Sequence, residues 1–84
     1  MKEILKENDY FESSDLALCA TLCCYGYRIE AIDKQNPQKA IFLIKRDKRL
    51  DNLIQKYWTH QLKVEPMSFF NFLKEIKARI YSQG

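Results

Sequence analysis

The chain has 84 residues, of which 46% are hydrophobic and 30% are charged, and it contains only two glycines and two prolines. This composition predicts one folded domain, residues 1–84, and excludes a disordered chain with long irregular loops. The net charge is +3, and no apolar run approaches the roughly 20 residues that a membrane-spanning helix needs, so we expect no membrane association.

The two ends of the chain, residues 1–9 and 82–84, are mostly polar, and we expect both to fray. The N-terminal stretch lacks the apolar core of a signal peptide, which predicts a cytoplasmic protein. Tyr10 and Phe11 follow this stretch, and we expect them to dock on the core in a short extended segment.

Residues 13–26 predict a short helix that is apolar on almost every side. Ser13 or Ser14 can cap its start, and the charge of Asp15 is favourable at the positive end of the helix dipole. Gly26 stands where a helix commonly ends in a left-handed residue. A helix without a polar face must be covered on most sides, so we expect this one at the centre of the fold.

Two strands are predicted to follow, over residues 27–33 and residues 40–44. The first segment alternates, and one of its faces would be formed by Tyr27, Ile29 and Ala31. The second is a continuous apolar run, A-I-F-L-I, with the length and composition of a buried strand. Residues 34–39, with Asn36 and Pro37 at the tip, have the composition of a turn, so we expect the strands to pair as an antiparallel hairpin.

A second helix is predicted after the hairpin, with Asp47 as the candidate N-cap. Its apolar positions follow helical spacing and form one stripe: Leu50, Leu53, Ile54, Tyr57, Trp58 and Leu62. Residues 62–65 lead into Pro66, and a residue before proline avoids the helical region. This link is therefore a candidate for a short third strand.

A third helix is predicted from Pro66 to Tyr81, because proline suits the first helical position. Phe70 lies at the edge of its apolar stripe, which consists of Phe69, Phe72, Leu73, Ile76 and Ile80. The order of elements predicts an α+β fold of one helix, a β-hairpin and two further helices packed on both. The expected core between the hairpin and the helices consists of Phe42, Leu53, Trp58, Phe69, Leu73 and Ile76.

Several short motifs stand in a characteristic order: S-S-D-L-A-L in the first helix, F-L-I in the second strand, Y-W in the second helix and P-x-x-F-F-x-x-L-K-x-I-K-x-R-I-Y in the last. In order and spacing they resemble a family of short bacterial and phage-type domains of unknown function, over residues 10–81. That family usually has small alkyl residues where this chain has cysteines, and a more acidic stretch in place of K-R-D-K-R. The resemblance implies no activity, no cofactor and no catalytic residue.

Cys19, Cys23 and Cys24 are the candidates for metal binding or nucleophilic chemistry, with His60 as the one histidine. Structural zinc sites use two short-spaced pairs of ligands, whereas here only Cys19 and Cys23 share a helix face. A thiol on an apolar helix is a poor nucleophile, and the chain has no phosphate-binding loop, no G-x-S-x-G and no dinucleotide fingerprint. We therefore expect structural thiols, no metal, no cofactor and no enzymatic activity.

Charge is distributed unevenly along the chain. Residues 1–44 carry five basic and seven acidic side chains, whereas residues 45–84 carry nine basic and four acidic. This asymmetry predicts an anionic partner for the second half, or head-to-tail self-association. The candidate anion or nucleic-acid contacts are Lys45, Arg46, Lys48, Arg49, Lys74 and Lys77. Such binding would go to phosphates and tolerate any base sequence, and the simpler alternative is a solvated run of charges.

Two aromatic residues, Trp58 and Phe70, are candidates for an interface because each stands at the margin of its apolar stripe. The other aromatic residues have the spacing of core positions. We therefore predict a small non-enzymatic binding or interaction module, which acts on an unknown protein partner or on a second copy of itself. The alternative is a sequence-tolerant nucleic-acid-binding protein that uses its basic C-terminal half.

Overall fold

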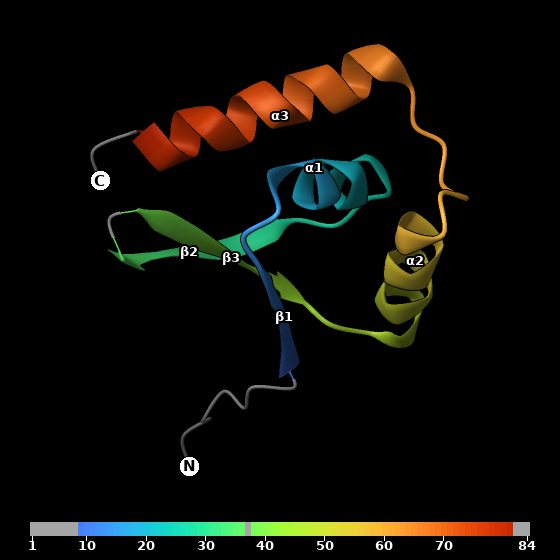
Figure 1. Cartoon of the computed structure of the whole chain (residues 1–84), viewed down its shortest axis with the longest axis horizontal. Coiled ribbons are helices and arrows are strands. Elements are labelled where there is room, and N and C mark those ends of the chain that lie inside the picture. Colours follow the sequence, from blue (N-terminus) through green and yellow to red (C-terminus); the bar gives the residue numbers. More distant parts are fainter. Residues whose placement is uncertain (1–8, 37, 82–84) are drawn as a thin grey trace.

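The described part of the chain forms three helices and one three-stranded sheet. The computed structural model describes residues 9–36 and 38–81, so the predicted fraying of residues 1–9 and 82–84 lies outside the described residues except at Asp9. These residues form an α+β domain of three helices and three antiparallel strands, which confirms the predicted fold class. The elements in chain order (Figure 1) are β1 (Tyr10–Ser13), α1 (Leu16–Cys24), β2 (Ile29–Asn36), β3 (Lys39–Lys45), α2 (Lys48–Trp58) and α3 (Pro66–Tyr81).

The sheet has the strand order β1-β3-β2, and both pairings are antiparallel. The predicted hairpin is confirmed as β2 and β3, and β1 pairs with the other side of β3. The third strand is therefore β1, and the prediction of a strand at residues 62–65 is wrong. That link is held beside the end of α1, where the hydroxyl of Tyr25 donates to the carbonyl of Lys63 at 2.6 Å and accepts its N–H at 3.3 Å.

The helix α1 lies at the centre of the fold, as its lack of a polar face predicts. Figure 1 shows it enclosed between the sheet and α3, with α2 at its side, and residues 18–22 are buried. Its N-cap is Asp15, whose carboxylate accepts the N–H of Leu18 at 3.1 Å, so the prediction of Ser13 or Ser14 as the cap is wrong. Ser13 belongs to β1, and its hydroxyl instead accepts the N–H of Asp15 at 3.0 Å.

Both α1 and α2 end in a Schellman motif, in which a left-handed residue follows the helix. After α1 this residue is Gly26, with φ of 98°, and the N–H of Tyr27 donates to the carbonyl of Leu22 at 3.2 Å. After α2 the same place is taken by His60, with φ of 61°. The helix α2 therefore ends before Leu62, which had been predicted to belong to its stripe.

The hairpin is longer than its sequence predicts. The strand β2 begins at Ile29, not at Tyr27, and it continues to Asn36. Since β3 begins at Lys39, four of the six residues of the predicted turn are strand. Asn36 closes the turn, because its side-chain oxygen accepts the N–H of Gln38 at 2.9 Å. The other residue of the predicted tip, Pro37, lies outside the described residues.

A bulge interrupts β2 and changes which of its side chains face the helices. Ile29 pairs with Ile44 and is buried, but the register shifts before Ala31, which pairs with Leu43 and is exposed. Ile32 then takes the helix-facing side and is half-buried. The predicted common face of Ile29 and Ala31 is therefore wrong, because an extra residue in one strand reverses the alternation beyond it.

The helix α3 has the predicted bounds. Pro66 occupies its first position, and the carboxylate of Glu65 accepts the N–H groups of Met67 at 3.1 Å and Ser68 at 2.7 Å. These bonds lower the pKa of Glu65, with the Ser68 N–H as the largest cause. Although α3 is the longest helix described, no helix within the described residues is long and apolar enough to cross a membrane.

The C-terminal part of α3 is fastened to β2. Arg79 donates from Nη1 to the carbonyl of Ile29 at 3.3 Å, and its own carbonyl accepts the ammonium of Lys34 at 3.1 Å. The apolar side of α3 packs on α1 and the shared core, as predicted. One face of α3 is thus covered by the domain, and the opposite face is left to solvent.

Most of the predicted core is confirmed. Phe42, Leu53 and Ile76 are buried, and Phe69 and Leu73 are partly buried against the same cluster, which also contains Leu18, Leu22, Ile44 and Leu50. Trp58 is the exception, since 60% of it is exposed. It is the last residue of α2 and stands at the margin of the stripe, where no other described element covers it.

Candidate functional site

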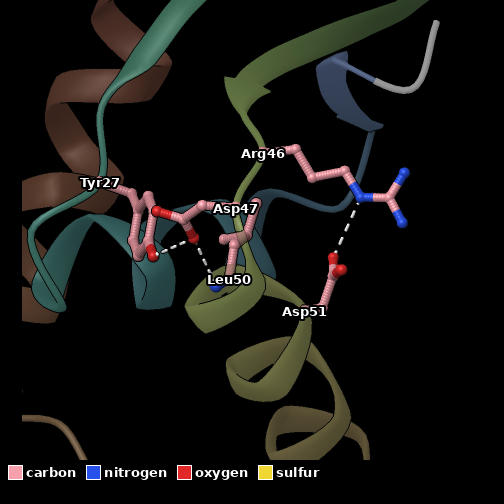
Figure 2. Close-up of polar contacts among 5 residues, drawn as sticks. All are labelled: Tyr27, Arg46, Asp47, Leu50 and Asp51. Atoms are coloured by element: carbon pink, nitrogen blue, oxygen red, sulfur yellow. Dashed lines mark hydrogen bonds and ion pairs between the residues drawn. The ribbon is translucent and has the colours of Figure 1, made fainter.

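The basic run of residues 45–49 lies at the junction of β3 and α2, around the carboxylate of Asp47. Its Oδ1 atom accepts the N–H of Leu50 at 2.7 Å, which confirms Asp47 as the N-cap, and it also accepts the hydroxyl of Tyr27 at 2.7 Å (Figure 2). The Tyr27 bond is the largest cause that lowers the pKa of Asp47, whereas burial and this bond raise the pKa of Tyr27. The junction is therefore a structural joint between the start of α2 and the loop after α1.

Two of the four cations in this run bind groups of the domain itself. Arg46 donates from Nε to Oδ1 of Asp51 at 3.1 Å, which makes an exposed ion pair (Figure 2). Arg49 donates to the backbone carbonyl of Tyr25 at 2.9 Å, and its guanidinium lies 5.3 Å from the centre of the Tyr27 ring. Both arginines hold the start of α2 in place, so neither is simply a solvated charge.

The other four predicted contacts are divided between two places. Lys45 is exposed at the end of β3 and Lys48 at the start of α2, whereas Lys74 and Lys77 are exposed on α3. Figure 1 shows the start of α2 and the helix α3 on opposite sides of α1. The fold therefore does not bring the six predicted cations together into one patch.

The solvent-facing side of α3 carries a row of apolar and basic side chains. Helical spacing places them on one side, opposite the core stripe, and all are exposed. We call this row the α3 outer stripe; it consists of Met67, Phe70, Lys74, Lys77 and Tyr81. The exposed fractions of Met67, Phe70 and Tyr81 are 62%, 51% and 80%. The ammonium of Lys74 lies 5.2 Å from the centre of the Phe70 ring, so a cation covers part of the row.

The second predicted interface residue, Trp58, is on a different helix. Its ring meets that of Tyr57 edge to face, with 5.0 Å between the ring centres. Tyr57 packs against the core and Trp58 projects outward. The structure thus leaves both sequence-predicted aromatics, Trp58 and Phe70, exposed, on separate elements.

The three cysteines are free thiols on α1. Burial raises the pKa of Cys19 to about 12 and that of Cys23 to about 11, and it also raises the pKa of Cys24. The thiolate is the nucleophilic form of cysteine, so the raised pKa values make these thiols less reactive at neutral pH. Within residues 9–36 and 38–81, no three His, Cys, Asp or Glu side chains are grouped as metal ligands.

The sequence did not predict the hollows that lie between the described elements. One, of about 550 Å³, lies between β1 and α2, and another, of about 420 Å³, lies between β2 and α3 beside Cys23. The first depends on β1 being an edge strand, which requires the pairing of residues far apart in the chain. The local signal for β1 was the aromatic pair Tyr10 and Phe11, from which a short extended segment was predicted.

Comparison with known proteins finds one family. A family model described as a domain of unknown function, DUF5659, matches residues 8–82. No curated protein and no solved structure matches the chain.

Proposed function

The chain belongs to the DUF5659 family of domains of unknown function, and we propose that it is a small non-enzymatic protein-interaction module. The α3 outer stripe is the observation that supports this proposal. Three large apolar side chains, Met67, Phe70 and Tyr81, are more than half exposed along one line of a helix. A row of this kind is typical of a surface that a partner covers.

The proposed partner presents an acidic and apolar surface. The α3 outer stripe contains two ammonium groups, Lys74 and Lys77, and no carboxylate. Carboxylates on the partner would be attracted to these lysines, while apolar side chains would cover Phe70 and Tyr81. An amphipathic helix with acidic flanks has this chemistry, because it can lie along α3 and meet residues at successive turns.

We place this interaction in the cytoplasm of a bacterium or in a cell infected by a phage. Three free thiols on one short helix are compatible with a reducing compartment. The family resemblance supports the bacterial or phage origin.

Photo-crosslinking at Phe70 tests the proposal. The photoreactive residue p-benzoylphenylalanine replaces Phe70 in the full chain, and the same residue replaces exposed Lys56 of α2 as the control. A protein captured from cells at position 70 and not at position 56 is then purified and its affinity measured. We expect Phe70→Ala and Tyr81→Ala each to weaken binding by about tenfold, because exposed aromatics that become buried are binding hot spots.

The matched control is Glu75→Ala, which changes an exposed α3 residue outside the stripe and should leave the affinity unchanged. Lys74→Glu should also weaken the complex, most strongly at low salt, because it places a carboxylate against an acidic partner. A partner that binds the Phe70→Ala chain as tightly as the native chain contradicts the proposal. So does binding to lipid vesicles or oligonucleotides that exceeds binding to the captured protein.

Nucleic-acid binding is the second proposal, and the α3 outer stripe supports it too. Phe70 and Tyr81 can stack on bases while Lys74 and Lys77 contact phosphates. Arg46 and Arg49 are engaged within the domain, which leaves Lys45 and Lys48 as the contacts at the junction of β3 and α2. A salt titration with single- and double-stranded oligonucleotides tests this reading, since phosphate contacts weaken steeply with salt. Binding that is absent at low salt, or unchanged by Lys74→Ala with Lys77→Ala, contradicts it.

A further inference from the structure

The open edge of β1 borders the groove that faces α2. Among the described residues, β1 pairs only with β3, so its other edge has no strand beside it. The groove there has a volume of about 550 Å³, and its walls come from β1, from Arg46 directly after β3, and from α2. The lining residues are Tyr10, Phe11, Glu12, Arg46, Asp51, Ile54 and Gln55.

The backbone groups that point into this groove follow from the pairing with β3. The N–H of Arg46 donates to the carbonyl of Asp9 at 3.0 Å, and the next pair along is Tyr10 with Lys45. Residues of an antiparallel strand turn their backbone groups alternately toward one neighbour and the other. Because Asp9 bonds toward β3, Tyr10 and Glu12 direct their N–H and C=O groups outward. The edge therefore offers two donors and two acceptors to a further strand.

Side chains around the edge supply both an apolar and an acidic surface. Phe11 pairs with Ile44 on the helix-facing side, and Phe11 and Ile54 are half-buried against the core. Glu12 lies on the opposite face of the strand and is exposed, with no ion-pair partner among the described residues. The Arg46–Asp51 pair lies at the start of β1, beside its ribbon in Figure 2, so this arginine is already neutralised.

We propose that this groove binds an extended basic peptide segment of a partner protein, which adds to β1 as a fourth, antiparallel strand. Its backbone would bond with Tyr10 and Glu12, the mode in which sheet edges take up peptides. A residue opposite Glu12 shares the face of that carboxylate, so it is lysine or arginine. A residue opposite Phe11 faces Ile54, so it is apolar. This site is separate from the α3 outer stripe, which lies on another element.

A peptide of alternating lysine and valine, about seven residues long, is the probe, because this is the length of an ordinary strand. It is capped at both ends and labelled with a fluorophore, and its binding to the full chain is measured by fluorescence anisotropy. Backbone amide NMR shifts should change most over residues 10–12 of β1 and at Asp51, Ile54 and Gln55 of α2. Shifts confined to α3 or β2 would overturn the proposal, as would the absence of binding at about 1 mM peptide.

Backbone methylation of the peptide separates strand addition from simple charge attraction. Opposite Tyr10 and Glu12 stand the lysines, whose N–H groups point at β1, while the valine N–H groups point away. We therefore expect N-methylation of the lysines to weaken binding by about tenfold or more, because two hydrogen bonds are lost. The peptide N-methylated at its valines has the same charge and should bind within about twofold of the parent. Equal binding of the two methylated peptides would overturn strand addition.

Two charge-reversing variants of the protein complete the test. Glu12→Lys should weaken the binding of the lysine–valine peptide by about fivefold or more, because attraction becomes repulsion at an exposed site. Glu30→Lys makes the same change on β2, at the other edge of the sheet, and should leave binding unchanged. Both side chains are exposed, so both variants should keep the native melting temperature. A Glu12→Lys chain that binds like the native chain would overturn the basic character of the ligand.

Discussion

The hydroxyl of Tyr27 and the N–H of Leu50 meet at one atom, Oδ1 of Asp47, and both hydrogen bonds measure 2.7 Å. Tyr27 comes after the C-cap Tyr25 and Gly26 that end α1, and Leu50 lies in the first turn of α2. One carboxylate oxygen therefore caps a helix and also fastens it to the loop after the central helix (Figure 2). The fold depends at this joint on an acidic residue within a basic run.

Removing the Tyr27 hydroxyl should weaken this joint without disturbing the helix cap. We expect Tyr27→Phe to lower the free energy of unfolding by about 1 kcal/mol, the typical net worth of one hydrogen bond. Asp47→Ala should cost more, because it removes the cap of α2 as well. Urea unfolding of both single variants and the double variant checks the coupling between them. Strictly additive losses would show that the two groups do not interact in solution.

The same joint should depend on pH in the acidic range. The Tyr27 bond holds the pKa of Asp47 below its ordinary value of 3.8, so the folded chain favours the ionised carboxylate. Its contribution to stability is present above that ordinary value and is lost as the pH falls through the lowered pKa. The stability difference between the native chain and Asp47→Asn should therefore shrink in strong acid. Thermal melts from neutral pH to about pH 2 measure it, and a difference that stays constant would contradict the assignment.

Alkaline pH should act through the thiol of Cys19. Burial raises its pKa from 9.0 to about 12, so the folded chain holds this proton more tightly than the unfolded chain. The stability that this raised pKa contributes is fully present below pH 9.0 and is lost as the pH rises toward about 12. Cys19→Ala should flatten this alkaline decline in urea titrations.

At neutral pH, iodoacetamide should label native Cys19 more slowly than Cys24, and urea should abolish the difference. Rapid native labelling of Cys19 would contradict its burial.

Two aromatic residues should respond very differently to truncation. Phe42 is 1% exposed on the central strand, so Phe42→Ala should cost about 3–5 kcal/mol of unfolding free energy. Trp58 is 60% exposed, so Trp58→Ala should cost less than about 1 kcal/mol. Chemical denaturation of the two variants checks this order. A large loss for Trp58→Ala would show that its ring is covered in solution, for example by a second copy.

The end of α2 offers a stabilising substitution. His60 has a φ of 61°, a left-handed conformation that costs a residue with a Cβ atom more than it costs glycine. We expect His60→Gly to stabilise the domain by about 1 kcal/mol. His60→Ala is the control, because it removes the imidazole and keeps the Cβ atom, so it should bring no such gain. Equal effects of the two variants would assign the change to the side chain and not to the backbone.

Local signals in the sequence were sufficient for the types of the helices and for many of their ends. The helix α3 begins at Pro66 and ends at Tyr81 as predicted, Asp47 caps α2, and Gly26 follows α1 with a positive φ. These features depend on side chains within a few residues of the backbone groups that they satisfy. The burial of α1 was equally predictable, because a helix that is apolar on all sides has no stable place at a surface.

Contacts between distant segments were decided only by the tertiary structure. The pairing of Tyr10 with Lys45 makes β1 the third strand and leaves the edge beside α2 open. A bulge turns Ala31 outward, and nothing in the local alternation announces it. Arg49 looks like a solvated charge in the sequence, yet it binds the carbonyl of Tyr25, which only folding brings near. Sequence periodicity determines which sides of an element are apolar, whereas packing determines which of those sides, and which strand edges, remain uncovered.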